Sequence, residues 1–296
     1  MKFDVAVIGG GPAGLSACIF ATRAGLKTIC IEKLAVGGQA SLSYEINNYP
    51  SYNSIAGADL TYKMFEQAKQ CGTEFVFKNV LQITKTKTGF TIKTRDDNYY
   101  AKKLIIACGT IPRRLDVQED KYVGKGVSYC ASCDGAFFKG KTVAIVGGGD
   151  SAFEYAEYLS RIVKKVYLLN RSEKFRANNL RVENARKLKN VKILTNAKVL
   201  ELKGDEVLSS INIDNNGKKQ NLVVDGLFVA IGHIPNLNFL NFTIDLDDNG
   251  YIKVNEYMQT SEKNVYACGD IVSKHFKQVI TACADGAIAG NSVIGD

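Results

Sequence analysis

Two cysteines, Cys130 and Cys133, are separated by only two residues and are followed directly by an acidic side chain, Asp134. This spacing suits a disulfide that opens and closes, and the adjacent carboxyl could carry a proton to a leaving thiolate. A zinc half-site would need two more ligands, but the other cysteines are dispersed and the chain has only two histidines, His233 and His275. Two unlinked buried thiols are the remaining alternative. The pattern favours a redox-active dithiol, and we expect no metal site.

A glycine-rich segment follows an apolar run near the N-terminus. Lys2–Ile8 predicts a strand and Pro12–Ala24 predicts a helix, and Lys27–Glu32 then predicts a second strand. Glycines in such a unit permit a tight turn and let the backbone approach a pyrophosphate at the helix N-terminus. A glycine-rich turn without a ligand is the alternative. The predicted dinucleotide contacts are Gly9, Gly11, Pro12, Ala13 and Gly14, with Glu32 accepting hydrogen bonds from ribose hydroxyls.

The same design recurs about half the chain later, starting 14 residues after Cys133. Lys141–Val146 predicts a strand, Ser151–Ile162 a helix and Lys165–Asn170 a second strand. Alanine stands at the third glycine position, which the dinucleotide fingerprint allows. The predicted contacts are Gly147, Gly149, Asp150 and Ser151. A dithiol lying between two dinucleotide sites implies a path for electrons from one nucleotide, through the other, to a disulfide outside.

The end of the second strand distinguishes the two units. The position that corresponds to Glu32 is Asn170, so the carboxylate expected to bind ribose is missing there. Arg171 and Arg176 follow, and arginines in place of the acid favour a 2′-phosphate and therefore NADPH. Ser172 lies between them and weakens this preference, so NADH stays open. Each arginine alone could equally be solvated surface.

A second motif near the C-terminus belongs with the first glycine loop. Thr260 is followed by six residues and then by Ala267-Cys268-Gly269-Asp270. A strand that ends in Gly-Asp beside the first unit could place Asp270 against the ribityl chain of a flavin. The alternative for this residue alone is a turn carboxylate.

These motifs together resemble the low-molecular-weight thioredoxin reductases over essentially the full length of the chain. The resemblance rests on Gly9-Gly10-Gly11-Pro12-Ala13-Gly14, Gly37-Gly38-Gln39, Asn48-Tyr49-Pro50, Cys130-Ala131-Ser132-Cys133-Asp134-Gly135, Gly147-Gly148-Gly149-Asp150-Ser151-Ala152, Ala267-Cys268-Gly269-Asp270 and Lys277-Gln278-Val279. It implies a homodimer that uses FAD and NADPH to reduce thioredoxin, with FAD at the first glycine loop.

The resemblance also implies roles for single residues. Cys133 would face the flavin, Cys130 would attack thioredoxin and Asp134 would be the acid catalyst. The residues expected to contact FAD beyond the first loop are Gly38, Gln39, Asn48, Gly109, Gly269, Asp270, Lys277, Gln278 and Val279.

Two positions depart from the pattern of that family. Asn170-Arg171-Ser172 replaces the usual His-Arg-Arg, so one of the customary arginines for the 2′-phosphate is absent. Lys277 replaces an arginine that is usual beside the flavin, which is a milder change.

Composition sets the class of protein. The chain has 296 residues, 46% apolar and 23% charged, and no apolar run of 18 residues, so we expect a globular cytoplasmic protein that does not enter a membrane. The net charge of +8 arises between residues 113 and 200, where 18 Lys and Arg residues face 9 Asp and Glu. This excess suits a phosphorylated cofactor and an acidic protein partner, or it is simply a solvated surface. The basic residues are scattered, so nucleic acid is not expected.

We therefore expect an α/β fold with two Rossmann-like dinucleotide-binding domains, the second inserted in the first. Residues 1–112 and 242–296 would form the FAD domain, and residues 113–241 the NAD(P)H domain with the dithiol; Asn215-Asn216-Gly217 predicts a hairpin turn there. The expected activity is NADPH-dependent thioredoxin-disulfide reduction. The alternatives are a dithiol oxidase on the same scaffold, an NADH-dependent reductase of another disulfide protein, and a flavin-binding redox sensor without turnover.

Overall fold

The computed structural model describes residues 2–43 and 45–295 and divides into two compact units. The first unit combines Met1–Ile111 with Ile234–Asp296, and the second is Pro112–His233. The chain crosses between them on β7 (Thr110–Pro112) and β16 (His233–Pro235), which pair as a two-stranded sheet. The second unit is thus a continuous segment inserted in the first.

The return to the first unit comes earlier than the expected boundary after residue 241. Residues 234–241 belong to the first unit because their backbone pairs with its sheet. The Ile83 N–H donates to the Phe239 carbonyl at 2.7 Å, and the Asn241 N–H donates to the Ile83 carbonyl at 2.9 Å. The side chains of Phe239 and Leu240 also pack on the core of this unit. The first crossing differs from the expected boundary by one residue.

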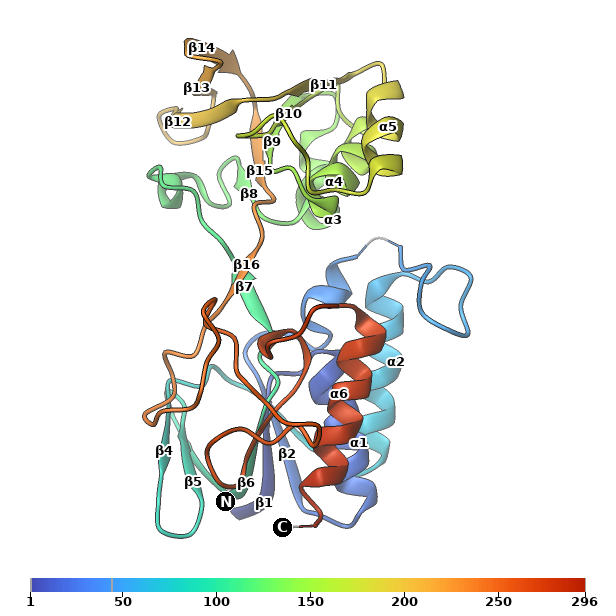
Figure 1. The fold of residues 1–296 in the computed structure, drawn as a ribbon, viewed down its shortest axis with the longest axis vertical. Coiled ribbons are helices and arrows are strands. Elements are labelled where there is room, and N and C mark those ends of the chain that lie inside the picture. The colour runs from blue at the N-terminus through green and yellow to red at the C-terminus, as the bar shows by residue number, and fades with distance from the viewer. Residues whose placement is uncertain (1, 44, 296) are drawn as a thin grey trace. The chain divides into compact units, whose positions relative to one another are not determined.

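The first unit is built on a sheet of strand order β3-β2-β1-β6-β5-β4, in which β17 also pairs with β6 (Figure 1). Strands β3, β2, β1, β6 and β17 run parallel, whereas β4 and β5 form an antiparallel hairpin against β6. The bounds are β1 (Lys2–Ile8), β2 (Thr28–Glu32), β3 (Glu74–Phe77), β4 (Gln82–Lys85), β5 (Phe90–Lys93), β6 (Asn98–Ile106) and β17 (Val265–Ala267).

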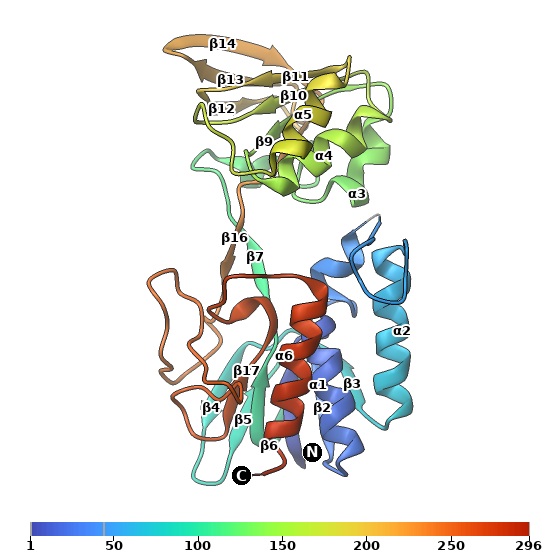
Figure 2. The same ribbon diagram turned by 45° about the vertical axis from the view of Figure 1, so that its right-hand side comes forward.

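The alternation of side chains along β1 explains the two layers on this sheet. Val5 and Val7 enter a core formed with helices α1 and α6, whereas Ala6 and Ile8 enter a core on the opposite face. Figure 2 shows α1, α2 and α6 together on one side of the sheet. The helices are α1 (Pro12–Arg23), α2 (Gly57–Gln70) and α6 (Val279–Ser292), with short 3-10 turns η1 (Gly38–Leu42) and η4 (Gly269–Ile271).

The second unit repeats this plan on a parallel sheet of order β11-β10-β9-β15-β8. Val143 and Ile145 of β9 pack toward helices α4 and α5, and Ala144 and Val146 pack toward a three-stranded antiparallel sheet. The bounds are η2 (Glu119–Tyr122), β8 (Val127–Ser128), α3 (Ala131–Asp134), η3 (Gly135–Phe138), β9 (Thr142–Val146), α4 (Asp150–Ser160), β10 (Lys165–Leu169), α5 (Asn179–Lys187), β11 (Val191–Leu194) and β15 (Gly226–Val229).

The three-stranded sheet contains the hairpin that the sequence predicts. It is formed by β12 (Ala197–Lys203), β13 (Ser210–Asn215) and β14 (Lys218–Val223). Asn216 and Gly217 join β13 to β14 with φ angles of 54° and 78°. Two consecutive residues with positive φ are typical of the tight turn that Asn-Gly favours.

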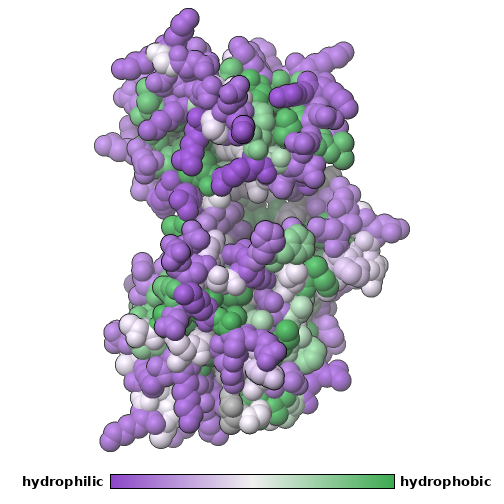
Figure 3. All heavy atoms as spheres, in the orientation of Figure 1, coloured by the Kyte–Doolittle hydropathy of each residue, from purple (hydrophilic) through white to green (hydrophobic). Residues whose placement is uncertain are grey.

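The displayed surface of each unit is mostly hydrophilic, with small separate apolar patches (Figure 3). Among the described residues, we find no helix with the length and apolar character needed to cross a membrane.

Candidate active site

The first glycine loop joins β1 to α1, as predicted. Gly9 has φ +106°, and a Cβ added there would lie 2.5 Å from the Ala107 carbonyl oxygen. A Cβ on Gly14 would lie 1.9 Å from the Gly9 carbonyl oxygen, so only glycine lets the helix approach the turn this closely. Gly11 is the N-cap of α1 and Pro12 is its first residue. The loop therefore presents the N-terminal end of a 12-residue helix, which favours an anionic phosphate group.

Glu32 ends β2 and folds back onto this loop. Its Oε2 accepts a hydrogen bond from the Gly10 N–H at 2.7 Å, and its Oε1 accepts one from the Leu34 N–H at 3.1 Å. These two bonds fix the carboxylate beside the glycine turn, where the sequence places it to receive a ribose. The remaining lone pairs of the carboxylate can still accept hydroxyl hydrogen bonds.

Other predicted flavin residues also lie in the first unit. The side-chain amide of Gln39 donates to the Thr110 carbonyl at 2.7 Å, and that of Asn48 donates to Gln278 Oε1 at 3.1 Å. Gly38 lies against the loop, since a Cβ on Gly11 would meet only the Gly38 Cα, at 4.0 Å. Gly109 has open space where a Cβ would stand. Val279 begins α6 directly after Gln278, which forms a capping box with Thr281.

Asp270 lies in the turn η4 that follows β17, within a cluster of charges. The Nζ atom of Lys274 is 4.0 Å from Asp270 Oδ1 and 2.5 Å from Asp285 Oδ2. Asp285 Oδ2 also accepts a hydrogen bond from the Gly269 N–H at 3.1 Å. Lys277 donates to the Asp270 carbonyl at 2.9 Å. Asp285 of α6 thus holds the Gly269 backbone, and Lys274, in the segment before α6, lies between the carboxylates of Asp285 and Asp270.

Burial lowers the pKa of the Lys277 ammonium, although nearby Asp270 opposes this shift. The ammonium lies 3.2 Å from the centroid of the Tyr251 ring, where a cation–π contact partly replaces water. The lysine therefore occupies the position expected for the family's arginine, at the same turn as Asp270.

The sequence analysis missed Asp285 and Lys274. Neither lies in a recognised motif, and each acts through a neighbour that does. Lys274 precedes α6 and Asp285 lies within it, and neither position follows a sequence pattern. Only the folded contacts with the η4 turn identify these two residues.

A dinucleotide such as FAD fits these residues in the first unit. The turn is accessible above Gly11, the helix end favours phosphate, and Glu32 and Asp270 supply acceptors for hydroxyl groups.

The second glycine loop has the same backbone design. A Cβ on Gly147 would lie 2.2 Å from the Ala230 carbonyl oxygen, and Gly149 is the N-cap of α4 with open space around its Cα. Ala152 occupies the third glycine position and is fully buried. Asp150 begins α4, and its Oδ1 accepts a hydrogen bond from the Asn178 N–H at 2.9 Å. Ser151 follows on the first turn and is exposed. The loop and helix end can hold a second pyrophosphate.

Asn170 occupies the place that Glu32 has in the first unit. A Cβ on Gly148 would lie 2.3 Å from Asn170 Oδ1, which shows that the side chain folds onto the glycine loop. Its Nδ2 donates to the Ser172 carbonyl at 2.8 Å and to the Lys174 carbonyl at 3.1 Å. Asn170 therefore binds the segment after the strand, where Glu32 binds the turn before the helix.

The arginine-bearing segment is held onto the second loop. The Arg176 N–H donates to the Gly148 carbonyl at 2.7 Å. Arg171 begins the same segment directly after Asn170 and is exposed. The segment that carries Arg171 and Arg176 therefore lies against the second glycine loop, and the contact of these side chains with a 2′-phosphate stays a prediction.

The dithiol pair is a disulfide in the second unit, with 5.4 Å between the Cα atoms of Cys130 and Cys133. Cys130 is the N-cap of the one-turn helix α3, and its Sγ accepts a hydrogen bond from the Cys133 N–H at 3.1 Å. Cys133 is exposed and Cys130 is partly buried. Asp134 is the last residue of α3, and its N–H donates to the Cys130 carbonyl at 3.2 Å. The predicted redox pair and candidate acid therefore share one turn of helix.

The other six cysteines, at positions 18, 30, 71, 108, 268 and 283, are free thiols in the first unit. Burial raises the pKa of Cys108 to about 12 and that of Cys268 well above its usual value. The thiols of Cys108 and Cys268 therefore stay protonated near neutral pH. Within residues 2–43 and 45–295, no group of three or more His, Cys, Asp or Glu side chains is arranged to hold a metal ion.

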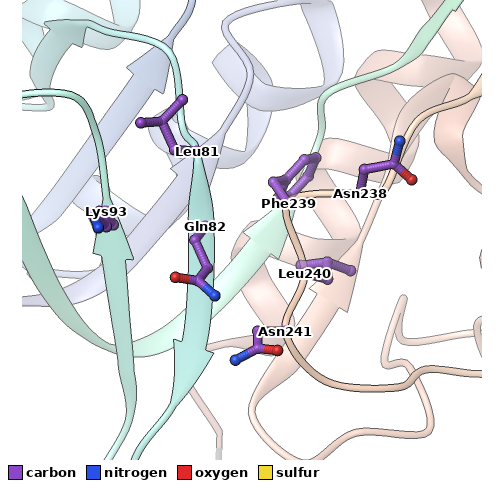
Figure 4. A pocket seen from close by; sticks show the side chains of 7 residues that line it. All are labelled: Leu81, Gln82, Lys93, Asn238, Phe239, Leu240 and Asn241. Carbon is purple, nitrogen blue, oxygen red and sulfur yellow. The ribbon is translucent and has the colours of Figure 1, made fainter.

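A shallow cavity of about 250 Å³ lies away from the glycine loops, where residues 238–241 run alongside strand β4 (Figure 4). It is lined by Leu81, Gln82, Lys93, Asn238, Phe239, Leu240 and Asn241. It contains none of the predicted site residues, so we assign it no role in the chemistry.

A model of the pyridine nucleotide-disulphide oxidoreductase family matches residues 3–286. The chain therefore belongs to this family. The family name implies FAD and a nicotinamide cofactor, which agrees with the two glycine loops.

Relatives narrow the class further. Thioredoxin reductase of Bacillus subtilis is 38% identical over 98% of this chain and 93% of its own. Thioredoxin reductase of Helicobacter pylori is 41% identical over 98% of this chain and 97% of its own. The solved thioredoxin reductase of Lactococcus lactis matches with a TM-score of 0.93 at 35% identity, covering 99% of this chain and 98% of that one. The resemblance to low-molecular-weight thioredoxin reductases and the fold class of two Rossmann-like domains are confirmed.

A further similar solved structure carries ferredoxin in its name. A ferredoxin-flavin thioredoxin reductase from Clostridium acetobutylicum is 31% identical, covers 99% of this chain and 97% of its own, and matches with a TM-score of 0.55.

Proposed function

We propose that this chain is an NADPH-dependent thioredoxin-disulfide reductase. The observation that carries the proposal is the Cys130–Cys133 disulfide, which lies in the same unit as a complete second nucleotide loop. A zinc half-site or two separate thiols would not pair in this way. The first unit supplies a full dinucleotide site of its own, as an electron relay requires.

Residues of the first unit hold the relay. The N-terminus of α1 would bind the pyrophosphate of FAD, Glu32 would accept hydrogen bonds from its ribose hydroxyls, and Asp270 would accept them from its ribityl chain. Bound FAD supplies a two-electron step between the nicotinamide and the disulfide. Gly9 and Gly14 allow the tight turn before α1, because any side chain at either position would strike a carbonyl oxygen. Gly11 leaves the backbone open for the approach of the pyrophosphate.

The dithiol carries out the exchange with the protein substrate. Two electrons and two protons open the Cys130–Cys133 disulfide to two thiols. The Cys130 thiolate then attacks one sulfur of the thioredoxin disulfide, which forms a mixed disulfide and releases a thioredoxin thiolate. Cys133 attacks Cys130 in this mixed disulfide, which restores the internal disulfide and releases reduced thioredoxin. Asp134 protonates the leaving thiolate.

Trapping tests these assignments. Cys133→Ser should leave Cys130 able to form a stable mixed disulfide with thioredoxin, whereas Cys130→Ser should form none. Both variants should still accept electrons from NADPH at the flavin, measured by its bleaching near neutral pH. If Cys130→Ser traps thioredoxin and Cys133→Ser does not, the two sulfurs have exchanged roles.

The second loop supports a preference for NADPH over NADH. We expect this preference to be weaker than it would be with an arginine at position 172 beside Arg171. Asn170 cannot offer a carboxylate to a 2′-hydroxyl, and it binds the segment that carries Arg171 and Arg176. Ser172 occupies the position of a third cation, and its hydroxyl donates to the Lys174 carbonyl at 2.9 Å. NADH therefore remains the second candidate donor.

The partner and surroundings follow from the same proposal. We infer an acidic thioredoxin as substrate, because the excess of positive charge lies between residues 113 and 200. We also expect a homodimer in the cytoplasm, with no nucleic acid and no membrane involved.

The decisive experiment is steady-state reduction of thioredoxin with NADPH, with NADH, and with reduced ferredoxin in place of both. The proposal expects turnover with NADPH above that with NADH, and none that requires ferredoxin. Turnover with ferredoxin alone would move the chain to a different donor. Oxygen uptake with a dithiol substrate and no nucleotide would indicate the dithiol oxidase, and no turnover under any condition would indicate a redox sensor.

A further inference from the structure

The residue before the dithiol, Tyr129, is held at both its side chain and its backbone. Its hydroxyl donates to the carboxylate of Glu119, which is 2% exposed and also accepts from the Leu115 N–H at 3.0 Å. Its carbonyl accepts a hydrogen bond from the Tyr155 hydroxyl at 2.7 Å. Burial raises the pKa of Tyr129, and the neighbouring Glu119 raises it further. These contacts fix the peptide that joins Tyr129 to Cys130.

Tyr155 belongs to α4, the helix that begins at the second glycine loop. It lies on the second turn of that helix, and burial raises the pKa of its hydroxyl to about 12. The hydroxyl therefore stays protonated and remains a donor to the Tyr129 carbonyl at any working pH.

Helix α4 also supports the other side of the cysteine turn. A Cβ added to Gly135 would lie 2.9 Å from Leu159 Cδ2 and 3.0 Å from Tyr158 Cε1, so the chain after Asp134 packs directly on α4. The peptide before Cys130 and the glycine after Asp134 are thus both attached to one rigid helix. Between these attachments lie only the two cysteines and the residues that accompany them.

We propose that Tyr155 is a positioning residue for the redox pair, which sets the reduction potential of Cys130–Cys133 by holding the Cys130 backbone on α4. The proposal rests on the proposed function only in taking this pair to be redox-active. Nothing in the glycine fingerprint or in the Cys-x-x-Cys pattern requires a tyrosine at this place.

The physical reason is the effective concentration of one thiol beside the other. Reduction breaks the sulfur–sulfur bond and adds two electrons and two protons, after which the two side chains are free to separate. A backbone held on both sides keeps Cys130 close to Cys133 and favours closure of the disulfide. Removal of the bond to the Tyr129 carbonyl lets the Cys130 peptide move in the dithiol form, so the disulfide becomes easier to reduce.

The test is the reduction potential of the pair in the Tyr155→Phe holoenzyme. Mixtures of reduced and oxidised dithiothreitol provide both halves of the exchange, so no nucleotide or thioredoxin is needed. Thiols are trapped with a maleimide at low pH and counted on the peptide that contains Cys130 and Cys133. We expect a three- to tenfold shift of the equilibrium toward the dithiol, which is about 15–30 mV toward less negative potential at 29.6 mV per tenfold.

Two further variants make the result specific. Tyr129→Phe removes the bond to Glu119 and should shift the equilibrium in the same direction as Tyr155→Phe. Tyr167→Phe is the matched control, because it also removes one tyrosine hydroxyl from the second unit. Tyr167 lies on β10, and its ring packs against a different core cluster from the one that Tyr155 contacts. Its potential should equal that of the wild type. Thermal denaturation of each variant separates a loss of stability from a change in potential.

The outcomes separate the two levels of the argument. A wild-type pair that cannot be reduced and reoxidised in these mixtures overturns the proposed function itself. A reversible pair whose potential is unchanged in Tyr155→Phe overturns only the role of Tyr155. An equal shift in Tyr167→Phe also overturns that role, because general loosening of the unit would then explain it.

Discussion

The two glycine loops share a backbone and differ in one side chain. In both, a strand ends at a glycine with positive φ, a glycine N-caps the helix, and an added Cβ would strike a carbonyl of the neighbouring strand. In the first loop Glu32 accepts from the turn, whereas in the second Asn170 donates to the segment beyond the strand. The same backbone design therefore occurs in both units, and the residue at the end of the second strand is where they differ, which is why we propose that this residue selects the ribose.

The largest expected effect is on FAD affinity, and it comes from the third glycine position of the loops. This position is Gly14 in the first loop and Ala152 in the second. Gly14→Ala places a Cβ 1.9 Å from the Gly9 carbonyl oxygen, so the loop must open. We expect FAD affinity to fall at least about 100-fold, which is about 2.7 kcal/mol. Titration of apoprotein with FAD, followed by fluorescence, measures it.

The matched control is Ala152→Gly in the second loop, where the chain already has the larger residue. It should leave NADPH affinity within about threefold, because it removes a single methyl group from a buried site. Equal losses from both substitutions would contradict the difference in packing that we expect between the two loops at this position.

The second prediction concerns the side chain that distinguishes the loops. Asn170→Asp introduces a carboxylate beside the Ser172 and Lys174 carbonyls and offers an acceptor to a ribose 2′-hydroxyl. The ratio of kcat/KM for NADPH over NADH should fall about tenfold or more, since repulsion of the 2′-phosphate adds to the loss.

The reverse change sharpens the same comparison. Ser172→Arg adds a cation for the 2′-phosphate, worth about 1.5–3 kcal/mol, and should raise the ratio about tenfold or more. Equal or better use of NADH by the unaltered protein would contradict the selectivity that we propose.

A smaller effect is expected at the flavin site, where charges support Asp270. Asp285→Asn keeps an oxygen for the Gly269 N–H and loses the ion pair with Lys274. We expect FAD affinity to fall about three- to tenfold, roughly the worth of one partly buried charged contact. The readout is FAD binding by the apoprotein, with Asp4→Asn as a control that removes the charge of a separate ion pair, the one with Lys102. No change in affinity for Asp285→Asn would remove it from the site.

The smallest expected effect concerns the buried thiols of the first unit and the stability of the fold at high pH. The second unit holds its two cysteines as a disulfide, whereas the first unit holds all the free thiols. Burial raises the pKa of Cys268, and the nearby Asp285 adds to this. Above pH 9.0 the thiol ionises in the unfolded chain and stays neutral in the folded one, so stability falls as pH rises.

In Cys268→Ala, the free energy of unfolding should fall less steeply above pH 9, by about 1 kcal/mol per pH unit. Below pH 9 the substitution should have no pH-dependent effect. Denaturant unfolding at pH 8 and pH 10 measures the difference. The same alkaline loss in wild type and variant would show that other groups cause it.

Sequence reasoning reached most of the fold because the decisive signals are local. Gly9, Gly147 and the Asn216–Gly217 turn all require unusual backbone angles, which glycine and asparagine announce in the sequence. The place where the chain returns to the first unit was set eight residues too late, at 241/242. Phe239 and Leu240 belong to that unit through pairing with distant β4, and a short apolar segment does not show which sheet it joins.

The supporting residues of the site were not predictable for a related reason. Asp285 and Tyr155 lie on helices, and each acts through contacts with groups far from it in the chain that no local pattern records. Periodicity explains why such helices form. It does not show which hydroxyl or carboxylate will meet a carbonyl or an N–H group.

The insertion of one unit within the other has a consequence for synthesis on the ribosome. Residues 112–233 form the second unit without interruption, so it can fold as soon as they have emerged. Helix α1 appears much earlier, yet Gly286 and Gly290 of α6, which approach the Ala13 and Ala17 carbonyls, are made only after the whole second unit. We therefore expect the first unit to complete its fold after the second. A chain stalled near residue 260 would display a folded dithiol unit beside an exposed, incomplete flavin unit, the form that a chaperone would bind.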